Sequence, residues 1–284
     1  MERLDQFLNS LKYLPPAPTV LPELLRRLSR PDLDTSEIVT LLTFDPGLTA
    51  TILRVANSAF FGAAEPASTL AEAVTRLGYH QVLLLVATIC GATTLSQPKS
   101  SYGLDAGQLW RHSVATALAA ETLAQTTGQD INVAFTAGLL HDLGKIVLAE
   151  ALEGKPDGLF AHTERPGQSR LESERAVLGL DHAEVGGRLL TRWQFAEPLA
   201  AAVTHHHSPA AAGQHRRLAA CVHLGNLIAH SLGLCSGAQA LAVDAHAAAL
   251  DFLGLAPERW PHCVLRGLDR FQQMRSLVNV RQTA

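Results

Sequence analysis

The sequence predicts an all-α protein. Alanine and leucine dominate its 284 residues, and aromatic side chains make up only 5% of them. No segment alternates polar and apolar residues with the period of a strand, whereas signals for helix starts and stops recur along the chain. With 47% hydrophobic and 17% charged residues, the chain can bury a sizeable core. We therefore expect a helical bundle.

Capping residues mark where the first helices should begin. Asp34 and Thr69 each precede a glutamate by three residues, the spacing of a capping box. Asp45 stands before Pro46, and proline is well suited to the first position of a helix. Helix ends are indicated by glycines, namely Gly62, Gly78, Gly128 and Gly154.

Composition divides the chain into three parts. Residues 1–97 form a first set of short helices, the N-terminal helical subdomain, which ends at the polar stretch SQPKSSYG. Residues 98–240 form the core and hold almost all the histidines in patterned positions. Residues 241–284 read as further helices that pack back on the rest. The segment 152–170 contains two prolines and three glycines and is expected to be a loop that covers or borders a site.

The stretch NSAFFG (57–62) carries two adjacent phenylalanines near a predicted helix end. We expect it to form a turn whose aromatic side chains anchor in the core. The alternative is a docking surface or a contact between the two halves of the chain.

The charge balance gives no general attraction for nucleic acid. The net charge is −3 and the isoelectric point is near 6.5, and the basic runs near Arg26 and Arg216 are short. We expect these runs to be ordinary solvated faces, and we expect no nucleic-acid partner.

The chain is expected to be cytoplasmic. Its start is charged and amphipathic rather than leader-like, and the longest apolar stretch, residues 82–95, is too short to span a bilayer. No membrane partner is therefore expected. The cysteines form no CxxC pair, which predicts reduced residues rather than disulfides or a zinc knuckle; they are Cys90, Cys221, Cys235 and Cys263.

The segment AGLLHDLGK raises the question of function. His141 and Asp142 interrupt an apolar run that should be a buried helix, and burial of unpaired polar groups costs several kcal/mol. His112, His182 and the triplet 205–207 also lie on or beside apolar helical faces. Metal ligation would compensate all of these groups at once, because neutral imidazole and carboxylate are common ligands of transition metals.

The order H…HD…H…HH resembles that of the HD superfamily of metal-dependent phosphohydrolases, in which a helical core holds one or two divalent ions. The resemblance places Lys145 at a position that faces phosphate, and it gives Asp142 and Lys145 the catalytic roles. The ligand positions that it implies are His112, His141, Asp142, His182, His206 and His207.

Several further stretches resemble one branch of that superfamily, the HDOD family, over roughly residues 10 to 235. This resemblance implies an HD-like core and a signalling module coupled to response regulators or second messengers. The stretches are LPPAPTVLPELL, FDPGLTATILRVANSAFFG, TLAEAVTRLGYHQVLLL, LWRHSVA, ESERAVLGLDHAEVGGRLLTRW, HHHSP and HLGNLIAH.

Two features depart from the catalytic superfamily. Asn226 stands where a closing aspartate is usual, and an amide oxygen brings no negative charge to a dication. The GYP signature of cyclic-dinucleotide phosphodiesterases is also missing, because SPAAAGQH follows the triplet.

Structural alternatives remain for each candidate. His141 and Asp142 could form a buried hydrogen-bonded pair, and Lys145 could be a surface residue. His182 could cap a helix beside Asp181, and Asn226, a candidate ligand, could be a packing amide. The triplet could be a fraying helix end, although alignment favours His206 and His207 over His205. Five histidines without a pattern are expected at the surface or in the core, namely His215, His223, His230, His246 and His262.

We therefore predict a regulatory HDOD protein that acts through signalling partners, with a bound divalent ion. Fe, Mn, Zn, Ni and Mg are not distinguished by the sequence. The alternative is a metal-dependent phosphohydrolase that acts on a nucleotide or cyclic nucleotide. A nucleotide or phosphoester ligand and a homodimer are both compatible with this prediction.

Overall fold

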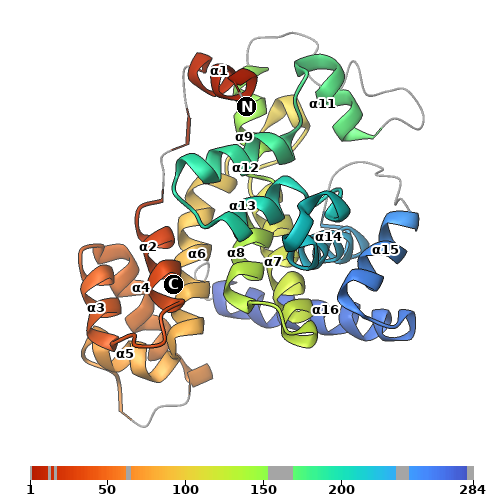
Figure 1. The fold of residues 1–284 in the computed structure, drawn as a ribbon. Helices are drawn as coiled ribbons and strands as arrows, with labels where there is room; N and C mark the ends of the chain where they lie inside the picture. The colour runs from red at the N-terminus through yellow and green to blue at the C-terminus, as the bar shows by residue number, and fades with distance from the viewer. Residues whose placement is uncertain are drawn as a thin grey trace. The chain divides into compact units, whose positions relative to one another are not determined.

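The computed structural model describes residues 2–11, 14–15, 18–61, 65–152, 169–234 and 243–279. This part of the chain consists of α-helices and short 3-10 helices without a strand, which confirms the all-α prediction (Figure 1). The helices are α1 (Glu2–Ser10), α2 (Val20–Leu28), α3 (Thr35–Thr43), α4 (Pro46–Ala56), η1 (Ala59–Phe61), α5 (Leu70–Leu77), α6 (Tyr79–Leu95), η2 (Ser100–Tyr102), α7 (Gln108–Thr127), α8 (Ile131–Leu140), α9 (Leu143–Ala151), α11 (Arg170–Leu178), α12 (His182–Arg192), α13 (Glu197–Thr204), η3 (Pro209–His215), α14 (Arg216–Ser231), α15 (Val243–Leu253), η4 (Pro257–Arg259) and α16 (Trp260–Asn279).

Most of the predicted caps are confirmed. Thr69 and Glu72 form a reciprocal capping box at the start of α5, and Asp45 accepts hydrogen bonds from the first turn of α4. Gly78 and Gly128 end α5 and α7, whereas Gly62 and Gly154 lie outside the described residues.

The capping box predicted at Asp34 is wrong, because the Asp34 side chain accepts from the second residue of α3 and not from Glu37, the third. Asp34 caps α3 by accepting from the backbone N–H of Ser36 at 2.8 Å. The Glu37 carboxylate, however, binds Arg30 Nη1 at 2.8 Å. Glu37 is therefore engaged by a guanidinium from the preceding turn rather than by the cap, because an ionised donor is the stronger partner.

Contacts group the chain into two units. The first comprises residues 1–16 and 91–274, and the second comprises residues 17–90 and 275–284. The predicted boundaries at 97/98 and 240/241 stay a prediction. Most of the predicted loop 152–170 lies outside the described residues. Cys235 lies outside them as well.

The second unit contains helices α2 to α5, each packed on a neighbour, and the residues of α6 up to Cys90. Its core contains Leu24, Ile38, Ile52 and Val74, all fully buried. The predicted turn after α4 is present, because Asn57 ends the helix and exchanges hydrogen bonds with the backbone of Ala67.

The aromatic anchor predicted in this turn is wrong. The Phe60 side chain is 61% exposed, and Phe61, whose ring lies 5.0 Å from that of Phe60, is only half-buried. The short η1 helix, Ala59–Phe61, continues the turn and leaves Phe60 largely exposed. The apolar character of a dipeptide does not determine which way its side chains point.

The first unit is organised around α7, which packs along α8 and α14, while α12 packs against α9 and α13 (Figure 1). Two glycines permit close backbone approach. A Cβ at Gly138 would lie 2.8 Å from Ala117 Cα, and a Cβ at Gly225 would lie 2.8 Å from Thr116 O. Helices α8 and α14 therefore contact α7 almost backbone to backbone.

One segment of the described residues, Ile131–Ala151, is long and apolar enough to cross a membrane. The helices Leu70–Leu77 and Tyr79–Leu95 reach that length and hydropathy only when they are taken together, and they are bent by 107° at their junction. Of the residues in the apolar window of Ile131–Ala151, 78% are buried inside the fold. Such burial is typical of a core helix.

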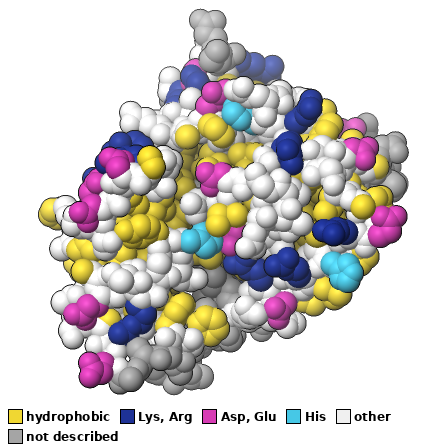
Figure 2. All heavy atoms as spheres, turned by 60° about the horizontal axis from the view of Figure 1, so that its bottom comes forward, with side chains coloured by type: hydrophobic (Ala, Val, Ile, Leu, Met, Phe, Trp, Pro, Cys, Tyr) yellow, Lys and Arg dark blue, Asp and Glu magenta, His cyan; other side chains and the backbone are white. Residues whose placement is uncertain are grey.

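Charged side chains are paired locally. Arg26 and Arg27 bind Glu23, and Arg30 binds Asp32 and Glu37. On the face drawn in Figure 2, basic and acidic groups are interspersed among hydrophobic and other side chains.

Candidate metal centre

Asp142 lies at the break between α8 and α9 and is 1% exposed. Its Oδ2 accepts a hydrogen bond from Lys145 Nζ at 2.6 Å and lies 3.4 Å from His141 Nε2 and 3.6 Å from His112 Nε2. Its Oδ1 lies 3.3 Å from His182 Nε2. The helix break thus places one carboxylate among side chains from α7, α8, α9 and α12.

A glycine brings His182 to this carboxylate. Helix α9 crosses α12 at Gly144, where a Cβ would overlap the carbonyl oxygen of His182 and lie 2.9 Å from the N of Gly186. No side chain fits between the two backbones. The glycine of the HDLGK stretch therefore sets the distance between Asp142 and His182.

His182 is the first residue of α12, and its side chain is not the cap. Asp181 is the N-cap, because its carboxylate accepts from the backbone N–H of Glu184 at 2.9 Å. The His182 ring is fully buried and lies between Asp142 and Glu174. Asp181, and not His182, therefore caps α12.

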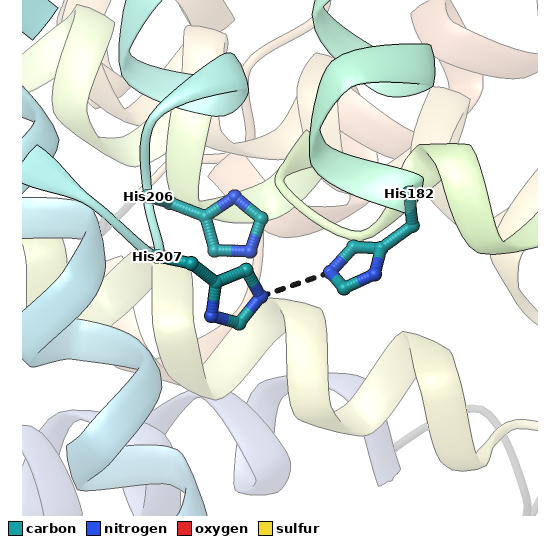
Figure 3. A group of neighbouring side chains, drawn as sticks. All are labelled: His182, His206 and His207. Atoms are coloured by element: carbon teal, nitrogen blue, oxygen red, sulfur yellow. Dashed lines mark hydrogen bonds between the residues drawn. The ribbon is translucent and has the colours of Figure 1, made fainter. Parts of the chain in front are cut away.

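His206 and His207 approach the same place from the end of α13. The helix ends at Thr204, and the following turn directs both rings toward His182 (Figure 3). The Nε2 atoms of His182 and His207 are 3.0 Å apart, and the rings of His206 and His207 are 4.0 Å apart. The helix end points into the site rather than fraying away from it.

The candidate ligand atoms form two groups, and the atoms within each group lie within 4.8 Å of one another. One group is His112, His141 and Asp142, and the other is His182, His206 and His207. Two atoms bound to one ion at about 2.1 Å lie about 3.0 to 3.4 Å apart when the geometry is octahedral or tetrahedral. The separations of 3.0 Å between His182 and His207 and of 3.4 Å between His141 and Asp142 fall in this range.

The hydrogen bonds of the rings also fit a cation. The Nδ1–H of His141 donates to Gly138 O at 2.8 Å, and that of His206 donates to Val203 O at 2.7 Å. Their Nε2 atoms, like Asp142 Oδ1, are buried without a hydrogen-bond partner among the described residues. These acceptor atoms present lone pairs to the interior, as a metal site requires.

Burial favours neutral imidazoles in this cluster. It lowers the pKa of His141 to about 4 and holds the pKa values of His112, His206 and His207 well below their usual range, with neighbouring histidines adding to the effect. For Asp142, burial acts to raise the pKa, but His141, Lys145, His182 and His112 together hold it well below its ordinary value.

Stability of the metal-free protein should therefore fall in mild acid. His141 has a lower pKa folded, about 4, than its ordinary value of 6.5, so the unfolded chain binds the proton first. Stability is complete above about pH 6.5 and is lost as the pH falls toward 4. His141 alone should remove about 2 kcal/mol between pH 6.5 and 5. Urea unfolding of chelator-treated protein measures this loss, and an unchanged free energy of unfolding would contradict it.

Three polar residues of α14 lie on the side of the helix that faces this cluster. The Nδ1–H of His223 donates to His206 O at 2.8 Å, and the His230 ring lies 5.1 Å from that of His112. Asn226 lies between them on the same face, since residues three and four apart are neighbours on a helix. It is 5% exposed and its Oδ1 has no hydrogen-bond partner among the described residues. The structure thus leaves Asn226 a candidate ligand.

Sequence reasoning missed His223 and His230 as neighbours of the site. Their spacing of three and four residues around Asn226 was the signal that could have found them. It also missed Glu174, which is buried against His182, and Tyr102, which is buried and donates to Glu174.

The remaining candidates lie elsewhere or differ from expectation. Lys145 is 8% exposed, so the alternative of a surface lysine is wrong. His205 ends α13 and is half-buried. His215 lies 3.5 Å from Glu197, and His262 is exposed. The side chain of His246 lies outside the described part.

The profile of the HDOD domain matches residues 14–209. The chain belongs to the HDOD family. The matched region includes both groups of ligand atoms and ends two residues after His207.

A curated relative of this HDOD chain is an uncharacterized protein of Treponema pallidum (strain Nichols), 30% identical over 220 residues. The alignment covers 75% of this chain and 42% of the relative, so the chain spans less than half the length of that protein.

Solved structures share the HDOD fold at 24% identity. An HDOD domain protein of unknown function from Geobacter sulfurreducens has a TM-score of 0.76, with 97% of this chain and 96% of that chain covered. A protein from Marinobacter aquaeolei VT8, described as a candidate signal transduction protein, has a TM-score of 0.74 over 97% of this chain and 65% of its own. A candidate phosphohydrolase from Shewanella amazonensis SB2B has a TM-score of 0.69 over 95% and 97% of the two chains.

Proposed function

We propose that this HDOD protein is a signalling module that holds a divalent metal ion at the His/Asp cluster and acts by binding partner proteins. One observation carries the proposal. Several buried Nε2 atoms, whose lone pairs are fixed by hydrogen bonds at Nδ1, gather around the Asp142 carboxylate. The ion would be held by the two groups of ligand atoms around Asp142 and His182.

The chemistry of the cluster favours a transition metal. Five imidazoles and one carboxylate suit Fe, Ni or Zn better than Mg, which prefers oxygen ligands. With Asn226 in place of a further carboxylate, the protein contributes less negative charge to a hard dication. The candidate metal is therefore one that binds nitrogen well.

Burial of the cluster favours a regulatory role over turnover. His141, Asp142, His182 and His206 are each at most 1% exposed. A substrate must reach the ion during catalysis, whereas a buried ion can stabilise a particular arrangement of helices for a partner to recognise. The described part of the fold fits the second role better.

A specific observation supports a second candidate, a metal-dependent phosphohydrolase. The two groups of ligand atoms adjoin each other through Asp142 and His182, and Lys145 lies 2.6 Å from the same carboxylate. A pair of ions held by these residues would supply an activated water. Water would then add to the phosphorus of a nucleotide or cyclic nucleotide, the ester P–O bond would break, and the leaving oxygen would take up a proton. Lys145 would bind the phosphate.

Metal content tests the proposal. Purified His206→Ala is expected to hold less than one tenth of the metal found in the wild type, because its Nε2 belongs to a ligand group. His205→Ala is the matched control, since this ring is in neither group, and it should retain the metal. Elemental analysis after loading with Fe, Ni or Zn gives the stoichiometry, and circular dichroism checks the fold. Equal metal content in both variants, or none in the wild type, would refute the proposal.

The same metal-loaded protein separates the two candidates. Release of nitrophenol from bis(p-nitrophenyl) phosphate, abolished in a folded Asp142→Ala variant, would establish the phosphohydrolase. Stoichiometric metal without turnover would support the signalling module.

A further inference from the structure

Glu174 is a fully buried carboxylate outside the metal-ligand pattern. It lies on α11, which is fixed at its start by the reciprocal capping box of Ser169 and Glu172 and ends at Gly179 in the left-handed region. A buried carboxylate is costly unless its oxygens are satisfied. Both oxygens of Glu174 are satisfied, and one of them binds His182.

The contacts of Glu174 determine which nitrogen of His182 carries hydrogen. Glu174 Oε2 accepts from the backbone N–H of His182 at 2.8 Å and lies 2.7 Å from the ring Nδ1. An ionised carboxylate only accepts hydrogen bonds, so Nδ1 must be the donor. Whenever the ring is neutral, the lone pair is then on Nε2, the atom that lies 3.0 Å from His207 Nε2 and 3.3 Å from Asp142 Oδ1.

Two carboxylates compete for the single proton of a neutral His182. Glu174 lies 2.7 Å from Nδ1, and Asp142 lies 3.3 Å from Nε2. Only the contact with Glu174 is a hydrogen bond, and its ionised acceptor makes it a strong one. His141 and His206 instead donate their Nδ1–H to backbone carbonyls, which carry no full charge.

We infer that Glu174 is a positioning residue that holds His182 in its Nδ1–H form, so that the Nε2 lone pair faces the cluster. The inference rests on the proposed function, because the lone pair serves a metal ion. Without the Glu174 charge, Asp142 would draw the proton to Nε2. Metal binding would then require the hydrogen to move from Nε2 back to Nδ1.

Tyr102 supports the carboxylate from the other side. Its hydroxyl donates to Glu174 Oε1 at 3.2 Å, and burial followed by the charge of Glu174 raises the pKa of Tyr102 well above its usual range, which keeps the proton on the hydroxyl. Arg170 donates to Tyr102 O at 3.3 Å, and its guanidinium lies 5.6 Å over the ring. The stretch predicted as a domain junction therefore contributes a buried side chain to this site.

Glu174→Gln tests the inference because glutamine keeps the shape and an acceptor oxygen but loses the charge. Metal-free His182 is observed by long-range proton–nitrogen NMR at pH 8, and its signal is assigned by its loss in His182→Gln. We expect Nδ1–H in the wild type and a shift toward Nε2–H in Glu174→Gln. The dissociation constant for Zn, measured by chelator competition, should rise about 10- to 100-fold.

Tyr102→Phe is the matched control. It removes the hydrogen bond to Oε1 and leaves both contacts between Glu174 and His182 in place. It should keep the Nδ1–H form and change the dissociation constant less than about threefold, within the effect of a single remote partner. An equal loss in both variants would overturn the inference, because it would indicate general disturbance of the core.

The outcomes separate the two proposals. If the wild type binds no metal, the proposed function fails, and the form of His182 in Glu174→Gln alone decides the role of Glu174. If the wild type binds metal while Glu174→Gln keeps both the Nδ1–H form and the affinity, Glu174 is not a positioning residue.

Discussion

Asp142→Asn is expected to lower the free energy of unfolding of the metal-free protein by about 3 to 5 kcal/mol, the usual result of removing one partner of a buried ion pair. Lys145 is 8% exposed, and its Nζ lies 2.6 Å from Asp142 Oδ2. Asparagine leaves that ammonium buried without a counter-charge. Urea unfolding at pH 7 in the presence of a chelator measures the loss.

The double variant Asp142→Asn/Lys145→Met shows whether the ion pair is the cause. Methionine fills the volume of the lysine stem without a charge, so the double variant should recover at least half of the loss. Lys145→Met alone leaves Asp142 beside three histidines and should cost less than Asp142→Asn. Additive losses in the double variant would show that the two residues act independently.

Gly144→Ala is expected to cost about 3 kcal/mol, at the upper end of the range for overpacked cores. A Cβ at this position would overlap the carbonyl oxygen of His182, and backbone atoms cannot rotate away as a side chain can. Helices α9 and α12 must separate, and His182 must move away from Asp142. Thermal unfolding measures the stability, and metal content should fall with it.

Gly267→Ala is the matched control for this helix crossing. Gly267 is also helical and buried, but its added Cβ would meet a methyl group of Ile228 at 3.2 Å. That side chain can shift, so the cost should stay below about 1 kcal/mol. Similar losses in the two variants would mean that the α9–α12 crossing has no special role.

The sequence predicted local features well, and it singled out histidines that the fold brings together. Thr69 and Asp45 cap their helices as expected because capping depends only on residues within one turn. The histidines converge as the resemblance implied, although their chemical role stays a prediction. The order of the His and Asp residues along the chain, which is shared with the family, indicates that they meet in space. Helical periodicity alone does not contain this information.

Glu174 could not be recognised from the sequence, because nothing local marks it as a buried residue. Glu172 and Glu174 both lie in the highly charged segment RLESERAVL. Glu172 completes an exposed cap, whereas Glu174 is fully buried. The difference comes from partners on distant segments, Tyr102 and His182, which only the folded chain brings together. The exposure of Phe60 was mispredicted for a related reason, since tertiary packing decides which apolar residues are covered.

The contacts of Asp142 come from helices that are far apart along the chain, and the ligand atoms extend from His112 to His207. An ion captured there would cross-link nearly a hundred residues at a single point. A free-ion concentration a hundred times the dissociation constant would add about 2.7 kcal/mol to the free energy of unfolding. The concentration of a trace metal would thereby set how rigid these helices are. A partner protein that binds only the rigid form would respond to the metal without contacting the ion.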